Sequence, residues 1–226
     1  IHALNALLVF WLTVRVLQAG WASSRRTILA GFCVALLWAV HPLQVSSALY
    51  IVQRMETLSL TFVMLGLIAY LHGRQRQIAG RRGWPWIAGT GALMVAGLTS
   101  KETAALLPAY TLALELTLLG FDAVSPRTRR FLRWGYATGG IAAALLYFLV
   151  IIPHFSAAGA YINRDFTAFE RVLTQCRVLP MYLGQALLPL PSSLKFYYDA
   201  FPPSHGLLTP ITTLLGALLL LCLATS

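Results

Sequence analysis

The chain has 226 residues, of which 58% are hydrophobic and only 11% are charged, and its mean hydropathy is +0.71. Because a soluble domain carries about 25% charged residues, this composition excludes a soluble globular enzyme and indicates a membrane protein. The 17 Lys and Arg residues exceed the 7 Asp and Glu residues, which gives a formal net charge of +10. In a membrane protein such an excess is first a topology signal, so we expect the lipid bilayer and no nucleic acid as a partner.

Eight apolar runs follow one another along the chain, each close to the roughly 20 residues that a membrane-spanning helix needs. They cover residues 3–18, 27–40, 55–71, 84–98, 103–119, 135–152, 176–190 and 209–224. The runs are continuous, whereas the strands of a membrane barrel alternate between apolar and polar side chains. We therefore predict an all-α polytopic transmembrane bundle of about 7–8 membrane helices, with residues 1–226 forming a single transmembrane domain.

The two ends of the sequence favour a fragment. The first run lacks the basic segment and the cleavage site of a signal peptide, and the last run continues almost to the final residue. We therefore expect an interior piece of a longer membrane protein. In that case residues before Ile1 hold part of the active site.

Basic residues are distributed unevenly between the runs. Ten arginines and one acid, Asp122, lie in the loops 19–26, 72–83 and 120–134. Four basic and four acidic residues lie in the loops 41–56, 99–103 and 153–175. By the positive-inside rule the first three loops are cytoplasmic and the other three face outward. Arg15 and Glu115, near the cytoplasmic ends of their runs, are expected to extend to the membrane interface and to have no chemical role.

The run 176–190 leaves two alternatives open. It is short and contains Pro180 and Pro189, so within 176–208 it is either a short spanning helix or a juxtamembrane or re-entrant segment. The second alternative is favoured, because residues 192–206 lack the arginines that mark the cytoplasmic loops.

Polar side chains gather in the first outward loop. Pro42 is expected to end or kink the preceding helix. A helix through residues 47–54 would place Ser47, Tyr50 and Arg54 on one face, a polar stripe that suggests a cavity lining or a membrane-embedded acid–base pair. The polar residues of this loop include His41, Gln44, Ser47, Tyr50, Gln53, Arg54 and Glu56.

The second outward loop is the short turn Ser100-Lys101-Glu102. Charges so close to the hydrocarbon region are costly unless they find partners. Lys101 and Glu102 could compensate each other as an ion pair at the interface. Alternatively, the Lys101 ammonium could offer a point charge to a phosphate.

These motifs occur in an order that resembles the GT-C glycosyltransferases. They are His41-Pro42, the run from Tyr50 to Leu58, the turn Ser100 to Glu102, and the scattered residues from Leu173 to Asp199. The similarity is closest to the transmembrane and tetratricopeptide-repeat O-mannosyltransferases and their bacterial counterparts. The opening Ile1-His2-Ala3-Leu4-Asn5 resembles the start of that family's second membrane helix, so the first helix and the first outward loop would precede this chain.

The resemblance implies transfer of a sugar from a polyprenyl-phosphate donor to a protein or glycan acceptor on the non-cytoplasmic face. It implies an integral protein of the bacterial inner membrane with its site facing the periplasm or exterior, and tetratricopeptide repeats in the full-length chain. The main catalytic acid would lie before Ile1. No obligatory metal is expected, although a divalent metal could bind through that preceding loop.

Such a transfer needs a carboxylate that activates the acceptor and cations that stabilise the departing phosphate. We expect Glu56 and Glu102 as the carboxylates. The candidate donor-phosphate contacts are Arg54, Lys101, Arg164, Arg171 and Arg177. The candidate cavity lining is His41, Gln44, Ser47, Tyr50, Gln53, Tyr198 and Asp199.

Two other functions fit the same composition. A polytopic transporter or lipid flippase would also direct a few charges into a cavity, although no second copy of either polar motif is found, as an inverted repeat would require. A non-catalytic scaffold would use Arg54–Glu56 and Lys101–Glu102 as structural ion pairs.

Overall fold

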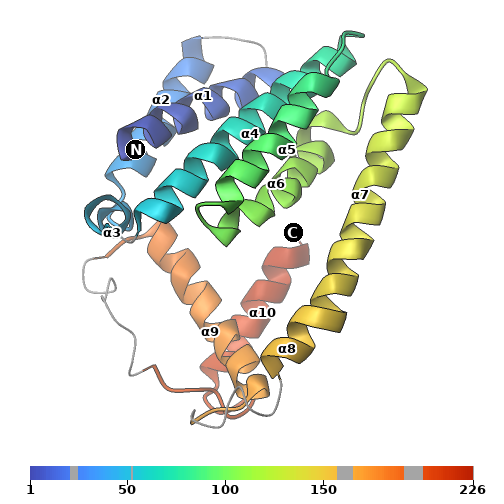
Figure 1. The fold of residues 1–226 in the computed structure, drawn as a ribbon. Coiled ribbons are helices and arrows are strands. Elements are labelled where there is room, and N and C mark those ends of the chain that lie inside the picture. Colours follow the sequence, from blue (N-terminus) through green and yellow to red (C-terminus); the bar gives the residue numbers. More distant parts are fainter. Residues whose placement is uncertain (21–24, 52, 157–164, 191–200, 226) are drawn as a thin grey trace. The chain divides into compact units, whose positions relative to one another are not determined.

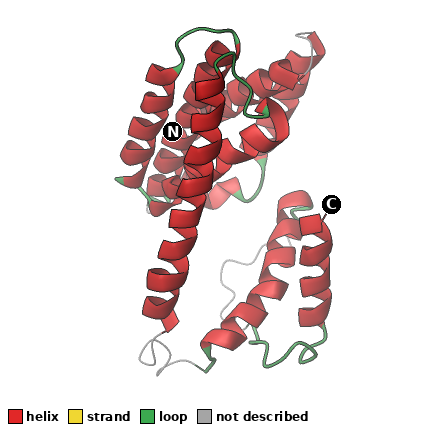
Figure 2. Cartoon of the chain, turned by 90° about the vertical axis from the view of Figure 1, so that its right-hand side faces the viewer, coloured by secondary structure: helices red, strands yellow, loops and turns green. Residues whose placement is uncertain are grey.

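The computed structural model describes residues 1–20, 25–51, 53–156, 165–190 and 201–225 (Figure 1). Every regular element in these ranges is a helix (Figure 2), which confirms the predicted all-helical class. The chain divides into two compact units, Ile1–Gly139 and Gly140–Ser226, and each is described by itself. The single transmembrane domain stays a prediction.

The first unit is built around one long helix. In chain order it contains α1 (His2–Gly20), α2 (Arg25–Val40), α3 (Gln44–Leu49), α4 (Arg54–Ile78), α5 (Trp84–Leu98), the 3₁₀ turn η1 (Glu102–Leu106), α6 (Leu107–Leu114), the π-helical turn η2 (Glu115–Leu119) and the first part of α7 (Pro126–Leu146). Helix α4 packs against both α1 and α5, and Figure 1 shows it between them. As predicted, α2 ends just before Pro42.

The second unit contains the end of α7 and four further elements. These are the π-helical turn η3 (Tyr147–Ile151), α8 (Ile152–Ser156), α9 (Ala168–Leu187) and α10 (Thr212–Thr225). Helices α9 and α10 pack closely, since a Cβ on Gly216 would lie 2.0 Å from the main-chain oxygen of Cys176.

Within the described ranges, four helical segments are long and apolar enough to cross a membrane: His2–Gly20, Arg54–Ile78, Glu102–Leu119 and Pro126–His154. Two shorter apolar helices are Trp84–Leu98 and Thr212–Thr225. These lengths and the hydropathy indicate a membrane protein. The many large apolar side chains on the surface have the same explanation, because lipid rather than water can cover them.

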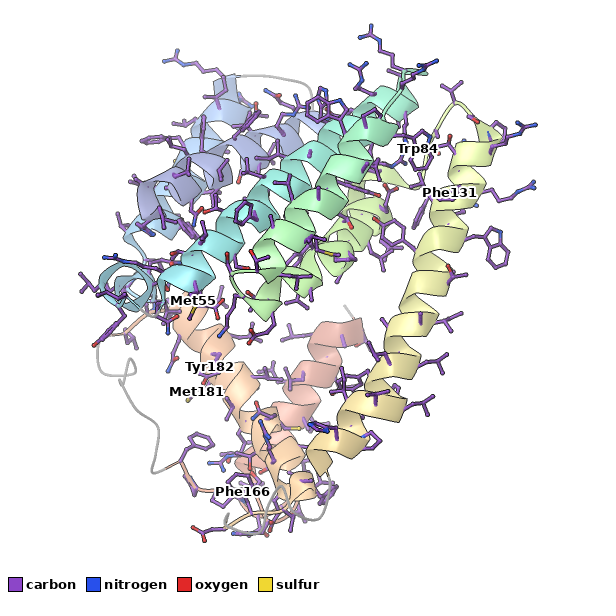
Figure 3. The ribbon with its side chains drawn as sticks, viewed as in Figure 1. Met55, Trp84, Phe131, Phe166, Met181 and Tyr182 are labelled. Atoms are coloured by element: carbon purple, nitrogen blue, oxygen red, sulfur yellow. The ribbon has the colours of Figure 1, made fainter. Side chains whose placement is uncertain are left out.

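The interior of the first unit lies along α4. One cluster joins Val63 and Leu67 to Ala104 and Leu107, and a second joins Tyr70 and Leu71 to Leu119. The start of α5 is held against α7 by Trp84 and Phe131, whose rings meet edge to face 5.2 Å apart (Figure 3). These contacts fix the positions of the helices around α4, and therefore of the polar residues at its two ends.

The predicted loops 72–83 and 120–134 are wrong in part, because much of each is helical. Helix α4 continues to Ile78, and α7 begins at Pro126. Arg74 is fully buried and paired with Glu115, so it does not belong to a solvated loop. The prediction that Glu115 extends to the interface is corrected by the same contact, because this carboxylate has no exposed surface.

The outward segments also contain more structure than expected. No single helix runs through residues 47–54, because α3 ends at Leu49 and α4 begins at Arg54. Between them, turn hydrogen bonds from the Gln53 N–H to the Tyr50 oxygen and from the Arg54 N–H to the Ile51 oxygen redirect the chain.

Helix α9 begins at Ala168, inside the predicted loop 153–175. Its start is set by a capping box in which the Glu170 N–H donates to Thr167 Oγ1 and the Thr167 N–H donates to the Glu170 carboxylate. The pattern Thr-x-x-Glu was available in the sequence. Pro180 lies inside this helix without ending it.

Candidate functional site

Three charged side chains meet where α4 and η1 begin. Lys101 Nζ lies 3.6 Å from Glu56 Oε1 and 3.5 Å from Glu102 Oε1. The Thr103 hydroxyl donates to Glu56 Oε2 at 3.1 Å. The two motifs that sequence analysis singled out in separate loops thus form one cluster, with Glu56 paired to Lys101.

Local backbone contacts position this cluster. The N–H groups of Ser100 and Lys101 both donate to the Gly97 oxygen, which ends α5 in a tight turn. A Cβ on Gly97 would lie 2.7 Å from the Ala104 Cβ, so glycine permits the close approach of α5 and η1. Ser59 Oγ donates to the Lys101 oxygen at 3.4 Å and lies 3.3 Å from Thr103 Oγ1. The turn is thereby attached to α4.

A cavity of about 210 Å³ adjoins the cluster. Glu56 lines it together with side chains from α3, α4, η1 and α6. The other lining residues are Gln44, Ser47, Thr57, Ser59, Leu60, Val63, Thr103 and Tyr110. Most of these side chains carry hydroxyl, amide or carboxylate groups, so the cavity offers hydrogen bonds at one end of an apolar bundle.

The Lys101 ammonium is available to a further anion. Its side chain is 31% exposed, and both carboxylate contacts are longer than the roughly 2.7–3.2 Å of a well-formed hydrogen bond. The position of the Glu56 carboxylate is fixed further by the hydrogen bond that it accepts from the Thr103 hydroxyl. The same carboxylate lines the cavity. The arrangement therefore combines a cation that can hold a phosphate with a carboxylate that can accept a proton.

The remaining predicted residues of the first unit lie around this cluster in different ways. Tyr50, Gln53 and Arg54 are exposed at the turn before α4. His41 Nδ1 accepts the Leu43 N–H at 3.2 Å, which is a capping contact between α2 and α3. Gln44 and Ser47 line the cavity, and their proposed role in a donor site stays a prediction.

Arg177 of the second unit has local partners. Arg177 Nη1 donates to the Pro202 oxygen at 2.9 Å, and the guanidinium lies 4.6 Å from the centre of the Phe201 ring. Through these contacts Arg177 holds the segment 201–204 against α9. Arg171 is exposed on the first turns of α9. Arg164, Tyr198 and Asp199 lie outside the described residues.

Glu170, in the second unit, is an acid whose pKa is altered by its hydrogen bonds. His205 Nδ1 lies 2.6 Å from Glu170 Oε1, and the Thr167 N–H donates to Glu170 Oε2 at 2.7 Å. The hydrogen bond from the Thr167 main chain, followed by that from His205, lowers the pKa of Glu170 to about 2. Glu170 is thus a charged cap of α9.

Sequence reasoning missed the hydroxyl groups of the site. Thr57, Ser59, Thr103 and Tyr110 all line the cavity, and none was predicted. The repeated hydroxyl residues in Met55-Glu56-Thr57-Leu58-Ser59-Leu60-Thr61 were the available signal. Ser59 Oγ faces η1, whereas the Thr61 hydroxyl donates to Oδ1 of the buried Asn5 on α1, and Asn5 Nδ2 donates to the main-chain oxygen of Thr57.

Among the described residues, no group of three His, Cys, Asp or Glu side chains could hold a metal ion. The expectation of no obligatory metal stays a prediction. Comparisons with protein-family models, curated proteins and solved structures gave no match. The GT-C resemblance therefore rests on the short motifs alone.

Proposed function

We propose that this chain is part of a GT-C-like membrane glycosyltransferase, a hexosyltransferase with about 7–8 helices in this segment. It moves a sugar from a polyprenyl-phosphate donor to a protein or glycan acceptor on the non-cytoplasmic face, in a bacterial inner membrane. Lys101 and Arg54 contact the donor phosphate. Glu56 accepts the proton of the acceptor hydroxyl, and Glu102 holds the Lys101 ammonium.

The observation that carries this proposal is the contact of Lys101 with Glu56 beside the polar cavity. A departing lipid phosphate needs positive charge, and an attacking hydroxyl needs a base, within one small site. An exposed ammonium 3.6 Å from a carboxylate supplies both groups at the end of an apolar bundle. The apolar helices around the site suit a donor that is anchored in the membrane.

The test uses the full-length protein in proteoliposomes supplied with polyprenyl-phosphate sugars. Release of the lipid phosphate is measured for the wild type, Lys101→Ala, Arg54→Ala and Glu56→Gln. We expect each of these variants to lose release by at least about 100-fold, the usual contribution of a positioned acid–base or charge-stabilising group. Arg81→Ala, which removes an exposed arginine at the other end of α4, is the control and should keep wild-type release.

A charge exchange separates chemistry from a structural ion pair. The double variant Glu56→Lys with Lys101→Glu keeps the pair but reverses its ends, so a scaffold would retain its function. For the proposed transferase the double variant should be as inactive as Lys101→Ala. If the wild type moves a lipid-linked substrate across the bilayer without releasing lipid phosphate, the chain is a transporter or flippase and the proposal fails.

A further inference from the structure

A second cavity of the first unit lies between α1, α4 and α5 and has a volume of about 450 Å³. This is within the roughly 300–1,000 Å³ of ordinary ligand sites. Its walls are mainly apolar and include Trp11, Leu65, Ala69 and Leu93. At one end it is lined by Arg15 and His72.

This cavity is separate from the candidate transferase site. Glu56 and His72 both lie on α4 and are 16 residues apart, which corresponds to about 24 Å along the helix axis. The two ends of the cavity also differ in polarity. From His72 to Leu65 the helix covers about 10 Å, over which the lining changes from basic to apolar.

Among the described residues, Arg15 has no anionic partner. Its Nη2 donates to Gln75 Oε1 at 2.7 Å and lies 3.2 Å from His72 Nδ1, and both groups are uncharged acceptors. Its Nε is buried and has no hydrogen-bond partner in the described part of the chain. No described carboxylate forms an ion pair with Arg15, although it lies within an apolar helix pair where an uncompensated charge is costly.

We propose that this cavity binds an anionic phospholipid. The phosphate group accepts hydrogen bonds from the Arg15 guanidinium, whose Nε has no partner among the described residues, and a guanidinium suits a phosphate in two-point contact. One acyl chain lies along Leu65, Ala69 and Leu93. The phospholipid thereby supplies a negative charge for Arg15. It also supplies an acyl chain that extends from the basic end of the cavity along its apolar walls.

The test is native mass spectrometry of the full-length protein in detergent, with equal amounts of phosphatidylglycerol and phosphatidylcholine. The wild type should retain phosphatidylglycerol preferentially. Arg15→Gln should reduce that preference on the order of tenfold, the effect of losing one charge-assisted hydrogen bond. Arg26→Gln is the control: it removes an exposed arginine of α2 outside the cavity, so the preference should remain.

A second variant tests the acyl-chain part of the site. Ala69→Phe fills the cavity and leaves Arg15 intact, so it should also abolish the retained phosphatidylglycerol. This variant carries the test if Arg15→Gln does not fold.

Three results would overturn the proposal. Equal losses in Arg15→Gln and Arg26→Gln would mean diffuse attraction of anionic lipid to any arginine. Unchanged binding in Ala69→Phe would mean that no acyl chain occupies the cavity. Binding of soluble glycerol phosphate as tight as that of the phospholipid would identify a free phosphate ligand instead.

Discussion

At the scale of single residues, the most consequential contact is the buried ion pair of Arg74 with Glu115. Neither side chain has exposed surface. Tyr70 OH donates to Glu115 Oε1 at 2.7 Å, and the Phe121 N–H donates to Glu115 Oε2 at 2.9 Å. Arg74 Nη2 donates to the Asp122 oxygen at 2.7 Å. A buried pair with this many partners joins α4 to the start of η2 and to the loop that follows η2.

Removing one partner of this pair should destabilise the protein strongly. We expect Glu115→Gln to lower the free energy of unfolding by about 3–5 kcal/mol, because the Arg74 guanidinium is left buried without its counter-charge. The measurement is denaturant unfolding in detergent. The matched control is Asp122→Asn, since the Arg129–Asp122 pair is 47% and 69% exposed and 3.6 Å long, and such a pair contributes about 0–1 kcal/mol. Equal effects of the two variants would contradict the structural role given to Glu115.

At the scale of helices, glycines set how closely α4 and α5 approach. A Cβ on Gly83, the residue before α5, would lie 2.1 Å from the main-chain oxygen of Gly73 in α4. No atom lies within 4 Å of the corresponding position on Gly89, which is also in α5. An added methyl group would therefore collide with backbone at Gly83 and lie in open space at Gly89.

Gly83→Ala should destabilise the protein by about 1–3 kcal/mol, since backbone must move to admit the methyl group. Gly89→Ala should stabilise it by about 0.5–1 kcal/mol, because alanine favours a helix more than glycine does. Thermal unfolding of both variants in the same detergent measures the difference. If Gly83→Ala were as stable as Gly89→Ala, the close crossing of α4 and α5 would be refuted.

At the scale of the whole molecule, orientation in the membrane decides which side the candidate site faces. The arginine distribution predicts that residues 41–56 face outward and residues 120–134 face the cytoplasm. Val45 and Val124 are exposed representatives of these two segments, so a cysteine at either position would be accessible to a reagent on its side.

We expect Val45→Cys to react with a membrane-impermeant thiol reagent in intact cells, and Val124→Cys to react only after permeabilisation. The background is the full-length protein with Cys33, Cys176 and Cys222 replaced, and this background without new cysteines is the control. The reverse labelling pattern would place the candidate site on the cytoplasmic face. It would exclude transfer on the outer side.

Composition and residue order alone are enough to recognise the helical membrane class and the two polar motifs that meet in the candidate site. Continuous apolar runs and few charges are properties of composition and order, so no tertiary information is needed to recognise them. The end of α2 just before Pro42 could also be predicted from local sequence, because proline lacks a hydrogen-bond donor and restricts the backbone of the residue before it.

Which charges meet depends on how the helices pack. Glu56 pairs with Lys101 of another loop, and Arg74 pairs with Glu115, 41 residues away. The hydroxyl groups around the cavity also come from α4, η1 and α6. Ion pairs form between groups that the packing of helices brings within a few ångströms, and the spacing of residues along one chain does not specify that packing.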